Sequence, residues 1–365
     1  MGGRIALFTR DLAGGGVGRV IVNLSKGFID RGHQVDVVLA RARGPYIEQL
    51  AGDVRVIDLG VERSLASIPG LVRYLRQERP LALLACADGA NVVALWSRWL
   101  ARGPTRMLIS IHTNVSQNAR AATKARGRLI PHFMRWFYGW ADDVIAVSEG
   151  VADDVAGIAR LNRQKIRVIY NPVDTENIKR LAAEPLQDPW FAPGAPPVVL
   201  SAGRLTRQKD FPSLLRAFAR VRQSRPARLV ILGEGEDRAA LEALARELDC
   251  REDVALPGFV SNPYPYMAAA AVFVSSSAWE GFGNVLIEAM ALGVPVVSTD
   301  CPSGPAEILD HGRYGVLVPV SDSDALARAI AATLEAPPEA SRNLERASSF
   351  SCDRIASQYL AVIAN

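Results

Sequence analysis

The stretch at residues 275–299, SSSAWEGFGNVLIEAMALGVPVVST, contains the pattern that decides the fold. An apolar run at residues 271–274 comes directly before it, and a glycine turn follows at Gly281 and Gly283. Apolar side chains then recur three and four positions apart up to Gly293, which predicts a helix with one buried face that ends at this glycine. A second apolar run comes next. The order of strand, glycine turn, helix and strand is typical of a parallel α/β sheet.

Two carboxylates flank the glycine turn. Glu280 precedes it and Glu288 follows in the predicted helix, with seven residues between them. A lone glutamate is usually a solvated surface residue. The unpaired N–H groups at the start of a helix and the small glycines suit an anionic ligand, however. A carboxylate on each side of such a turn therefore indicates a binding site.

The rest of the chain repeats this alternation. Apolar runs predict seven strands in the first half and six in the second, at residues 5–8, 35–39, 54–57, 81–85, 107–111, 144–147, 166–169, 198–202, 229–232, 254–256, 272–274, 294–298 and 315–318. Helical periodicity separates the runs, so each half is predicted to form a parallel, doubly wound sheet. A chain of 365 residues exceeds one ordinary core. A proline-rich segment at residues 185–197 interrupts the pattern, and we predict domains at residues 1–175 and 176–349.

Composition excludes several classes of protein. Hydrophobic residues make up 49% of the chain and charged residues 22%, which is typical of a folded globular protein. A formal net charge of +4 is too small for a general polyanion binder. The four cysteines are dispersed without a CxxC pair or zinc-ligand spacing, so we expect reduced thiols and a cytoplasmic location. No signal peptide is expected, and Asp88 interrupts the most apolar stretch, so no membrane-spanning helix is expected either.

A glycine run follows the first predicted strand. Gly14, Gly15, Gly16 and Gly18 precede a helix that we place near Arg19, and such glycines bring backbone N–H groups close to a ligand. A nicotinamide dinucleotide site is the alternative, but its fingerprint has an acid at the end of the second strand. This chain has arginines there, which disfavours that interpretation.

Two cations follow the first predicted strand of the second half. Arg204 and Lys209 come after residues 198–202, at the carboxyl end of that strand. Fixed positive side chains at such a place can neutralise a diphosphate leaving group. Solvated side chains are the alternative interpretation.

These residues together resemble the signature of the GT4-type retaining glycosyltransferases. The resemblance is carried by Glu280 and Glu288 with the turn between them, and by GRL at residues 203–205 followed by Lys209. It implies the GT-B architecture, in which two Rossmann-like domains face each other across a cleft. It also implies that a C-terminal helix at residues 350–365 packs back on the first domain.

The resemblance implies a role for each candidate residue. Arg204 and Lys209 would bind the diphosphate, Glu288 the ribose hydroxyls and Glu280 a hydroxyl of the transferred sugar. His112, at the end of a predicted strand, would lie near the reacting sugar, although a lone histidine is more often structural. The remaining donor contacts are implied at Gly16, Val260, Phe282, Gly283, Asn284 and Val285. The family often has an aliphatic residue in place of Asn284, and it generally needs neither a metal ion nor another cofactor.

Residues 89–141 contain no acidic residue but eight basic ones, interleaved with aromatic residues. Basic side chains beside aromatic ones suit the interface of an anionic bilayer. The residues expected at this membrane or acceptor surface are Arg120, Lys124, Arg126, Arg128 and Trp136. A solvated charge run, an aromatic core and a nucleic-acid patch are the alternatives, the last without a recognisable nucleic-acid motif.

The sequence therefore predicts a retaining glycosyltransferase. It would move a hexose or N-acetylhexosamine from a nucleotide diphosphate sugar, with UDP as the expected nucleotide, to a glycan or lipid-linked acceptor. Residues 300–305 are similar to those of bacterial cell-envelope glycosyltransferases, which favours polysaccharide synthesis at the inner face of the cytoplasmic membrane. A sugar-nucleotide epimerase of the same fold, a dinucleotide oxidoreductase and a nucleic-acid-binding protein are the alternatives.

Overall fold

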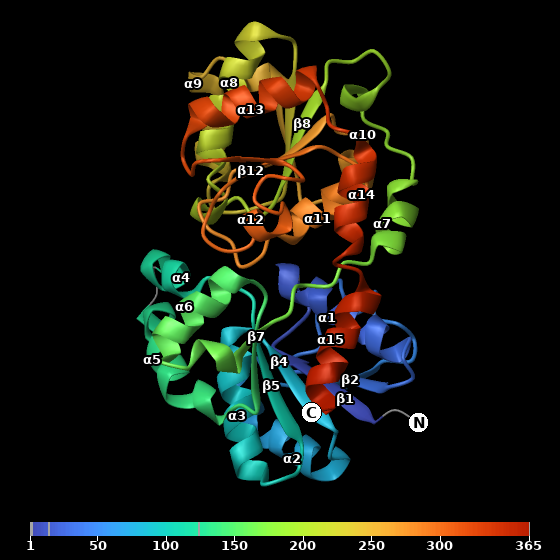
Figure 1. Cartoon of the computed structure of the whole chain (residues 1–365), viewed down its shortest axis with the longest axis vertical. Coiled ribbons are helices and arrows are strands. Elements are labelled where there is room, and N and C mark those ends of the chain that lie inside the picture. Colours follow the sequence, from blue (N-terminus) through green and yellow to red (C-terminus); the bar gives the residue numbers. More distant parts are fainter. Residues whose placement is uncertain (1–2, 14, 123–124, 365) are drawn as a thin grey trace. The chain divides into compact units, whose positions relative to one another are not determined.

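The computed structural model describes residues 3–13, 15–122 and 125–364. The chain divides into two compact units (Figure 1). The first unit ends at Val173 and takes up the chain again at Phe350, and the second runs from Asp174 to Ser349. Each unit is Rossmann-like, with one parallel sheet covered by helices.

The first unit contains a seven-stranded sheet in the order β3-β2-β1-β4-β5-β6-β7. Its strands are β1 Arg4–Thr9, β2 Gln34–Leu39, β3 Arg55–Asp58, β4 Ala82–Cys86, β5 Arg106–Ile111, β6 Asp143–Ala146 and β7 Ile166–Val168. Its α-helices are α1 Gly15–Ile29, α2 Ile68–Glu78, α3 Asp88–Ala101, α4 Val115–Ala121, α5 Ala125–Phe137, α6 Glu149–Ala159 and α15 Cys352–Ala364. Short 3-10 turns are η1 Ser64–Ser67, η2 Tyr138–Trp140 and η3 Arg163–Lys165.

The second unit contains a six-stranded sheet in the order β10-β9-β8-β11-β12-β13. Its strands are β8 Val198–Ala202, β9 Arg228–Leu232, β10 Val254–Gly258, β11 Val272–Ser275, β12 Val296–Thr299 and β13 Val316–Val318. Its α-helices are α7 Thr175–Ala182, α8 Phe211–Ser224, α9 Arg238–Glu247, α10 Tyr264–Ala269, α11 Asn284–Met290, α12 Pro305–Ile308, α13 Ser323–Glu335 and α14 Ala340–Ser348. Its 3-10 turns are η4 Pro189–Phe191, η5 Arg207–Lys209 and η6 Arg251–Asp253.

The predicted strands are confirmed in both sheets, and the interior strands are the most deeply buried, whereas the edge strands β3 and β13 are partly exposed. Strands β1, β4 and β8 are almost fully buried along their length, as a parallel sheet covered on both faces requires. In each sheet the first strand lies in the middle, with β2 and β4 beside β1, and β9 and β11 beside β8. The crevice outside the carboxyl ends of two such central strands is where doubly wound sheets bind ligands.

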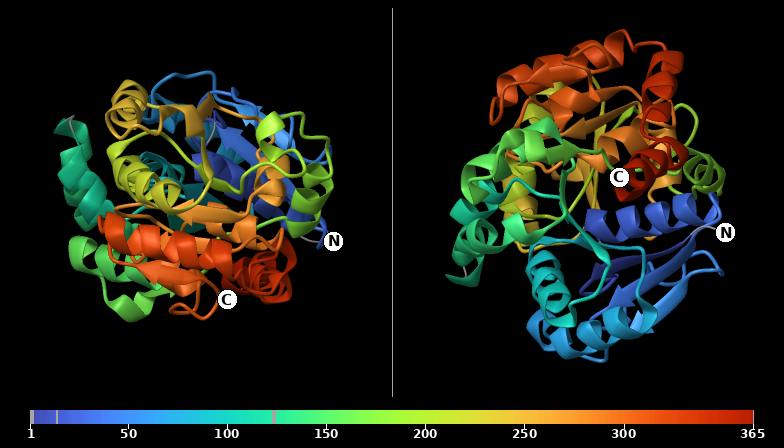
Figure 2. Two further views of the ribbon diagram at one scale, coloured as in Figure 1. Left: turned by 90° about the horizontal axis from the view of Figure 1, so that it is seen from above. Right: turned by 60° about the horizontal axis from the view of Figure 1, so that its bottom comes forward.

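The C-terminal helix α15 packs on α1 within the first unit (Figures 1 and 2). The rings of Phe28 and Tyr359 meet edge to face with 6.4 Å between centroids. Arg31 Nη2 on α1 donates to Asp353 Oδ1 at 2.6 Å and to Ser357 Oγ at 2.7 Å. The last helix therefore completes the core of the first unit by both apolar and polar contacts.

The prediction that the first helix starts near Arg19 is wrong. Helix α1 begins at Gly15, so Gly16 and Gly18 lie inside it. Gly18 is needed there because an added Cβ would come within 2.5 Å of the Tyr46 ring, on which the Arg19 guanidinium also stacks. Close packing on Tyr46 explains this glycine, while Gly14 lies outside the described residues.

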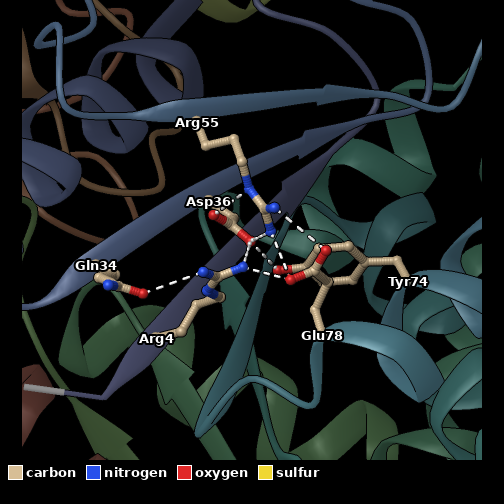
Figure 3. A network of polar contacts seen from close by, with 6 residues as sticks. All are labelled: Arg4, Gln34, Asp36, Arg55, Tyr74 and Glu78. Atoms are coloured by element: carbon tan, nitrogen blue, oxygen red, sulfur yellow. Dashed lines mark hydrogen bonds and ion pairs between the residues drawn. The ribbon is translucent and has the colours of Figure 1, made fainter.

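A polar network ties the amino ends of β1, β2 and β3 to α2 (Figure 3). Asp36, 2% exposed, accepts from Arg55 Nη2 at 2.5 Å and from the Tyr74 hydroxyl at 2.7 Å. Burial and the hydrogen bond to Asp36 raise the pKa of Tyr74. Glu78 joins Arg55 and Arg4 at the same edge. Asp36 is thus a structural residue in mid-strand and not the ribose-binding acid of a dinucleotide site.

Candidate active site

A buried ion pair lies at the carboxyl ends of the two central strands of the second unit. Lys209, at the end of the turn after β8, donates from Nζ to Glu280 Oε1 at 2.6 Å, and Glu280 follows β11. Their side chains are 17% and 9% exposed. The hydroxyl of Ser277 donates to the same carboxylate oxygen at 2.6 Å. Glu280 is therefore held by two donors at the switch point of the sheet.

Backbone contacts fasten the loop after β8 to the loop after β11. The Ser276 hydroxyl donates to the carbonyl of Lys209 at 2.7 Å, and Ala278 N–H donates to the carbonyl of Gln208 at 2.8 Å. Gln208 Nε2 donates in turn to the carbonyl of Trp279 at 3.0 Å. A Cβ on Gly203 would lie 2.9 Å from Lys209 Cε, so a side chain at position 203 would clash with the aliphatic part of Lys209. These contacts within the protein hold Lys209 in position.

A third loop supports the glycine turn from behind. Thr299 at the end of β12 donates to the carbonyl of Ser277 at 2.6 Å, and Glu280 N–H donates to the carbonyl of Pro302 at 3.2 Å. Gly304 has φ of 97°, and a Cβ there would stand 2.0 Å from the carbonyl oxygen of Phe282. Only glycine permits this approach. Residues 302–304 thus pack against the glycine turn and form one of its walls.

Arg204 and Lys209 differ in their electrostatic state. Arg204 is exposed, and its guanidinium makes no ion pair or hydrogen bond within the part of the chain that the structure describes. The charge of Lys209 is matched by Glu280. Arg204 therefore contributes positive charge after β8 that no acidic side chain of the described residues balances, as does the exposed Arg207 in the turn that follows.

The other predicted donor residues lie at several places. Glu288 is 5% exposed on α11, and Phe282 is 2% exposed in the turn before it. Gly283, Asn284 and Val285 are half-buried where α11 begins. Val260 follows β10, the edge strand of this sheet, and β9 lies between β10 and β8. Val260 is therefore two strands away from the loop that carries Arg204 and Lys209.

Two predicted residues belong to the first unit. Gly16 is exposed in the first turn of α1, just after β1. His112 follows β5, and burial lowers the pKa of its imidazole to about 4, although the nearby Asn171 side chain acts in the opposite direction. The imidazole is therefore neutral at pH 7.

Sequence reasoning missed the residues that hold the site together. The sequence pattern assigns no role in the site to Ser276, Ser277, Thr299 or Gln208. A run of serines directly after a buried strand was the available signal, because hydroxyls there are close to the backbone of neighbouring loops.

A second candidate surface lies on α3, α5 and η2 of the first unit. Trp99, Trp136 and Trp140 are 62%, 67% and 47% exposed. Together with Leu100, Leu129 and Phe133 they form what we call the aromatic face. Phe137 packs among them, with 5.0 Å between its ring centroid and that of Trp140.

Cations surround the aromatic face. Arg120 on α4 and Arg128 on α5 are exposed, as are Arg102 and Arg135. Arg106 is instead bound to Asp143 at 2.7 Å. The remaining residues predicted for this surface are Lys124, which lies outside the described residues, and Arg126, whose side chain is likewise not described.

The described residues contain neither a metal-binding cluster nor a membrane-spanning helix. No three histidine, cysteine, aspartate or glutamate side chains come together there in a way that would hold a metal ion. None of the described helices combines the length and the apolar composition needed to cross a bilayer.

Known proteins resemble the chain over both units. The profile of Glycosyltransferase Family 4 matches residues 14–177, and that of Glycosyl transferases group 1 matches residues 183–349. Lipopolysaccharide core biosynthesis glycosyltransferase LpsE of Rhizobium meliloti is 29% identical over 363 residues, 96% of each chain.

A Campylobacter jejuni protein is 38% identical over 200 residues, which is 54% of this chain. It is N-acetylgalactosamine-N,N'-diacetylbacillosaminyl-diphospho-undecaprenol 4-alpha-N-acetylgalactosaminyltransferase. The match spans about half of that relative, 52% of its length. Among solved structures, Anabaena Alr3699/HepE in complex with UDP superposes with a TM-score of 0.80 at 23% identity, over 99% of both chains. The chain therefore belongs to the GT4-type glycosyltransferases and has the two Rossmann-like domains of the GT-B fold.

Proposed function

We propose that this glycosyltransferase moves a hexose or N-acetylhexosamine from a UDP-sugar, with retention of configuration, to a glycan or lipid-linked acceptor of the cell envelope. The observation that carries the proposal is the fixed carboxylate Glu280, bound by Lys209 and Ser277 beside the unpaired cation of Arg204. UDP is supported by the Anabaena complexes with UDP and UDP-glucose. The lipid-linked acceptor is supported by the name of the Campylobacter relative.

In the proposed reaction the donor binds at the switch point of the second sheet. Arg204 and Lys209 receive the diphosphate, Glu288 accepts from the ribose hydroxyls and Glu280 accepts from a hydroxyl of the sugar. The remaining donor contacts would come from Gly16, Val260, Phe282, Gly283, Asn284 and Val285. No metal ion or other cofactor is part of the proposal.

The proposed chemical step is a same-face displacement. The bond between the anomeric carbon and the diphosphate oxygen breaks, and the acceptor oxygen forms its bond on the same face. The acceptor proton passes to the leaving UDP. His112 is neutral at pH 7, so its role in this proposal is to hydrogen-bond near the reacting sugar rather than to supply positive charge.

A binding screen tests the donor. Calorimetry against UDP, GDP, ADP and NAD, with EDTA present, is expected to show selective binding of UDP. Arg204→Ala should weaken UDP binding about 10- to 100-fold, the range for a lost charge-assisted hydrogen bond, without changing the melting temperature. Arg207→Ala, an exposed cation of the same turn, is the matched control. Binding of NAD alone, or of none of the four, would contradict the proposal.

We also propose that the aromatic face docks on an anionic lipid surface. Contiguous exposed apolar patches are uncommon on monomeric soluble proteins, and here ring contacts join the exposed Trp99, Phe133, Trp136 and Trp140 to one another and to Phe137. Tryptophan prefers the membrane interface, and exposed arginines around the face each add about 1 kcal/mol of attraction to anionic lipid. This surface would bring the protein to a lipid-linked acceptor at the inner face of the membrane.

Vesicle co-sedimentation tests the docking. The protein should bind vesicles of phosphatidylglycerol but not of phosphatidylcholine, and Trp136→Ser should weaken binding. The matched control is Phe259→Ser, because Phe259 is 68% exposed in the second unit, against 67% for Trp136. Arg120→Ala with Arg128→Ala should weaken binding about 30-fold at low salt. Equal binding of all variants would refute the docking surface.

A further inference from the structure

An unsatisfied carboxylate lies at the switch point of the first sheet. β1 and β4 are its central pair, and Asp88 begins α3 two residues after β4 ends. Ala87 before it has φ of 98° and ψ of 144°, a conformation that alanine rarely adopts. The side chain is partly covered, and its Oδ1 is buried with no hydrogen-bond donor within the described ranges.

A second buried oxygen lacks a donor on the same face of α3. Asn91 is 0% exposed and lies three positions after Asp88, one turn along the helix. Its Nδ2 donates to the carbonyl of Ser110 at 3.0 Å and contacts the Tyr138 hydroxyl at 3.1 Å, which fixes the amide orientation. Its Oδ1 then has no donor among the residues with described positions. Thr113 Oγ1, just beyond β5, is also buried without a partner.

The surroundings of Asp88 add negative charge instead of removing it. Burial, and to a smaller extent the negative charge of Asp154 on α6, raise the pKa of Asp88 to about 6. Asp154 has a partner of its own, because its Oδ2 accepts from Ser116 N–H at 3.0 Å. An acid in the first turn of a helix normally has a lowered pKa, so the cost of burial outweighs the helix dipole here.

Asp88 Oδ1 and Asn91 Oδ1 can only accept hydrogen bonds, whereas the Ser110 and Thr113 hydroxyls and the His112 ring, also buried without a partner among the described residues, can both donate and accept. A ligand that satisfies the Asp88 and Asn91 oxygens must supply donors, and a sugar presents hydroxyl donors on a small, neutral body. A metal ion is less suitable, since no three ligating acids, histidines or cysteines gather among the described residues.

We propose that Asp88 and Asn91 form a binding site for a hydroxyl group of the acceptor sugar. The carboxylate and the amide oxygen accept hydrogen bonds from that sugar, so the first unit selects the acceptor at β1 and β4 as the second unit holds the donor at β8 and β11. This inference rests on the proposed transfer reaction. Asp88 is a binding residue in it and takes no proton from the substrate.

The experiment compares Asp88→Asn with wild type. Asn keeps the shape and removes the buried charge, so the unliganded variant should melt at a higher temperature than wild type at pH 7.5. The methyl α-glycosides of glucose, galactose, N-acetylglucosamine and N-acetylgalactosamine are then titrated in the presence of saturating UDP. The glycoside that binds wild type should bind the variant about 10- to 100-fold more weakly. UDP affinity should stay the same.

The control is Asp153→Asn, since Asp153 is exposed on α6 and pairs with Arg163. It should change neither the melting temperature nor glycoside affinity. A lower melting temperature of Asp88→Asn than of wild type would show that the Asp88 carboxylate makes stabilising hydrogen bonds within the protein, and this result would overturn the inference. Equal glycoside affinity in variant and wild type, or no binding by any of the four glycosides, would overturn it as well. Failure of UDP to bind, with glycoside affinity still dependent on Asp88, would contradict the proposed donor and leave this site standing.

Discussion

Replacing Lys209 by Met should destabilise the second unit by about 3 kcal/mol, because it leaves a buried charge without its counter-ion. Glu280 is 9% exposed and would keep only the Ser277 hydroxyl as a donor. Removing one partner of a buried ion pair costs about 3–5 kcal/mol, and the partly exposed lysine places this pair at the low end. A domain of this size loses about 2–4 °C of melting temperature per kcal/mol, so the expected decrease is about 6–12 °C.

Thermal unfolding at pH 7.5 without nucleotide measures this decrease. Arg204→Met is the matched control, since it removes an exposed cation from the same loop and should change stability by less than about 0.5 kcal/mol. Glu280→Gln combined with Lys209→Met should recover most of the loss, because the neutral amide oxygen still accepts from Ser277. An equal effect of Lys209→Met and Arg204→Met, or no recovery in the double variant, would refute the assignment of a buried pair.

Three further predictions concern the first unit. The pKa of His112 is about 4, below the ordinary 6.5, so neutral His112 contributes to the stability of the folded state above pH 6.5. This contribution, about 3 kcal/mol in all, is lost as the pH falls toward 4. The free energy of unfolding of His112→Asn should therefore decrease less between pH 7.5 and pH 4.5 than that of wild type. The pKa of Asp88 is raised from 3.8 to about 6, so its ionised form lowers the stability of the folded state at neutral pH. The free energy of unfolding of Asp88→Asn should exceed that of wild type by up to about 3 kcal/mol at pH 7.5, and the difference should vanish near pH 4. Tyr74→Phe should cost about 1.5–3 kcal/mol by removing a buried donor to Asp36, measured by denaturant unfolding, and should leave UDP affinity unchanged.

The sequence was sufficient to predict both sheets, because a strand buried on two faces must be apolar throughout, as β1, β4 and β8 are, and the edge strands follow the same alternation with helices. The pair of Glu280 and Lys209 could be expected to meet, since both follow strands that end at the same edge of one sheet. The start of α1 could not be predicted, because glycines inside a helix contradict its propensity and only packing against Tyr46 explains one of them.

The aromatic face was only partly predictable for a related reason. Trp136 stood out by its basic neighbours, whereas Trp99, Leu129 and Phe133 did not. Which side of a helix faces solvent depends on what packs on the other side, and α3 and α5 pack against each other. That information is tertiary and is absent from the local pattern.

Asp88 and Glu280 occupy corresponding places, after the fourth strand of each Rossmann-like sheet. Among the described residues Lys209 and Ser277 donate to Glu280, so contacts within the protein offset the energy of burying this carboxylate. Asp88 Oδ1 has no donor among the described residues, and Asp154 adds repulsion. A buried acceptor left unsatisfied costs about 1–3 kcal/mol, which a structural residue has no reason to retain when Asn or Ser would fit. The first ligand to donate a hydrogen bond there recovers that energy, so this edge of the first sheet favours occupation by a hydroxyl-bearing molecule.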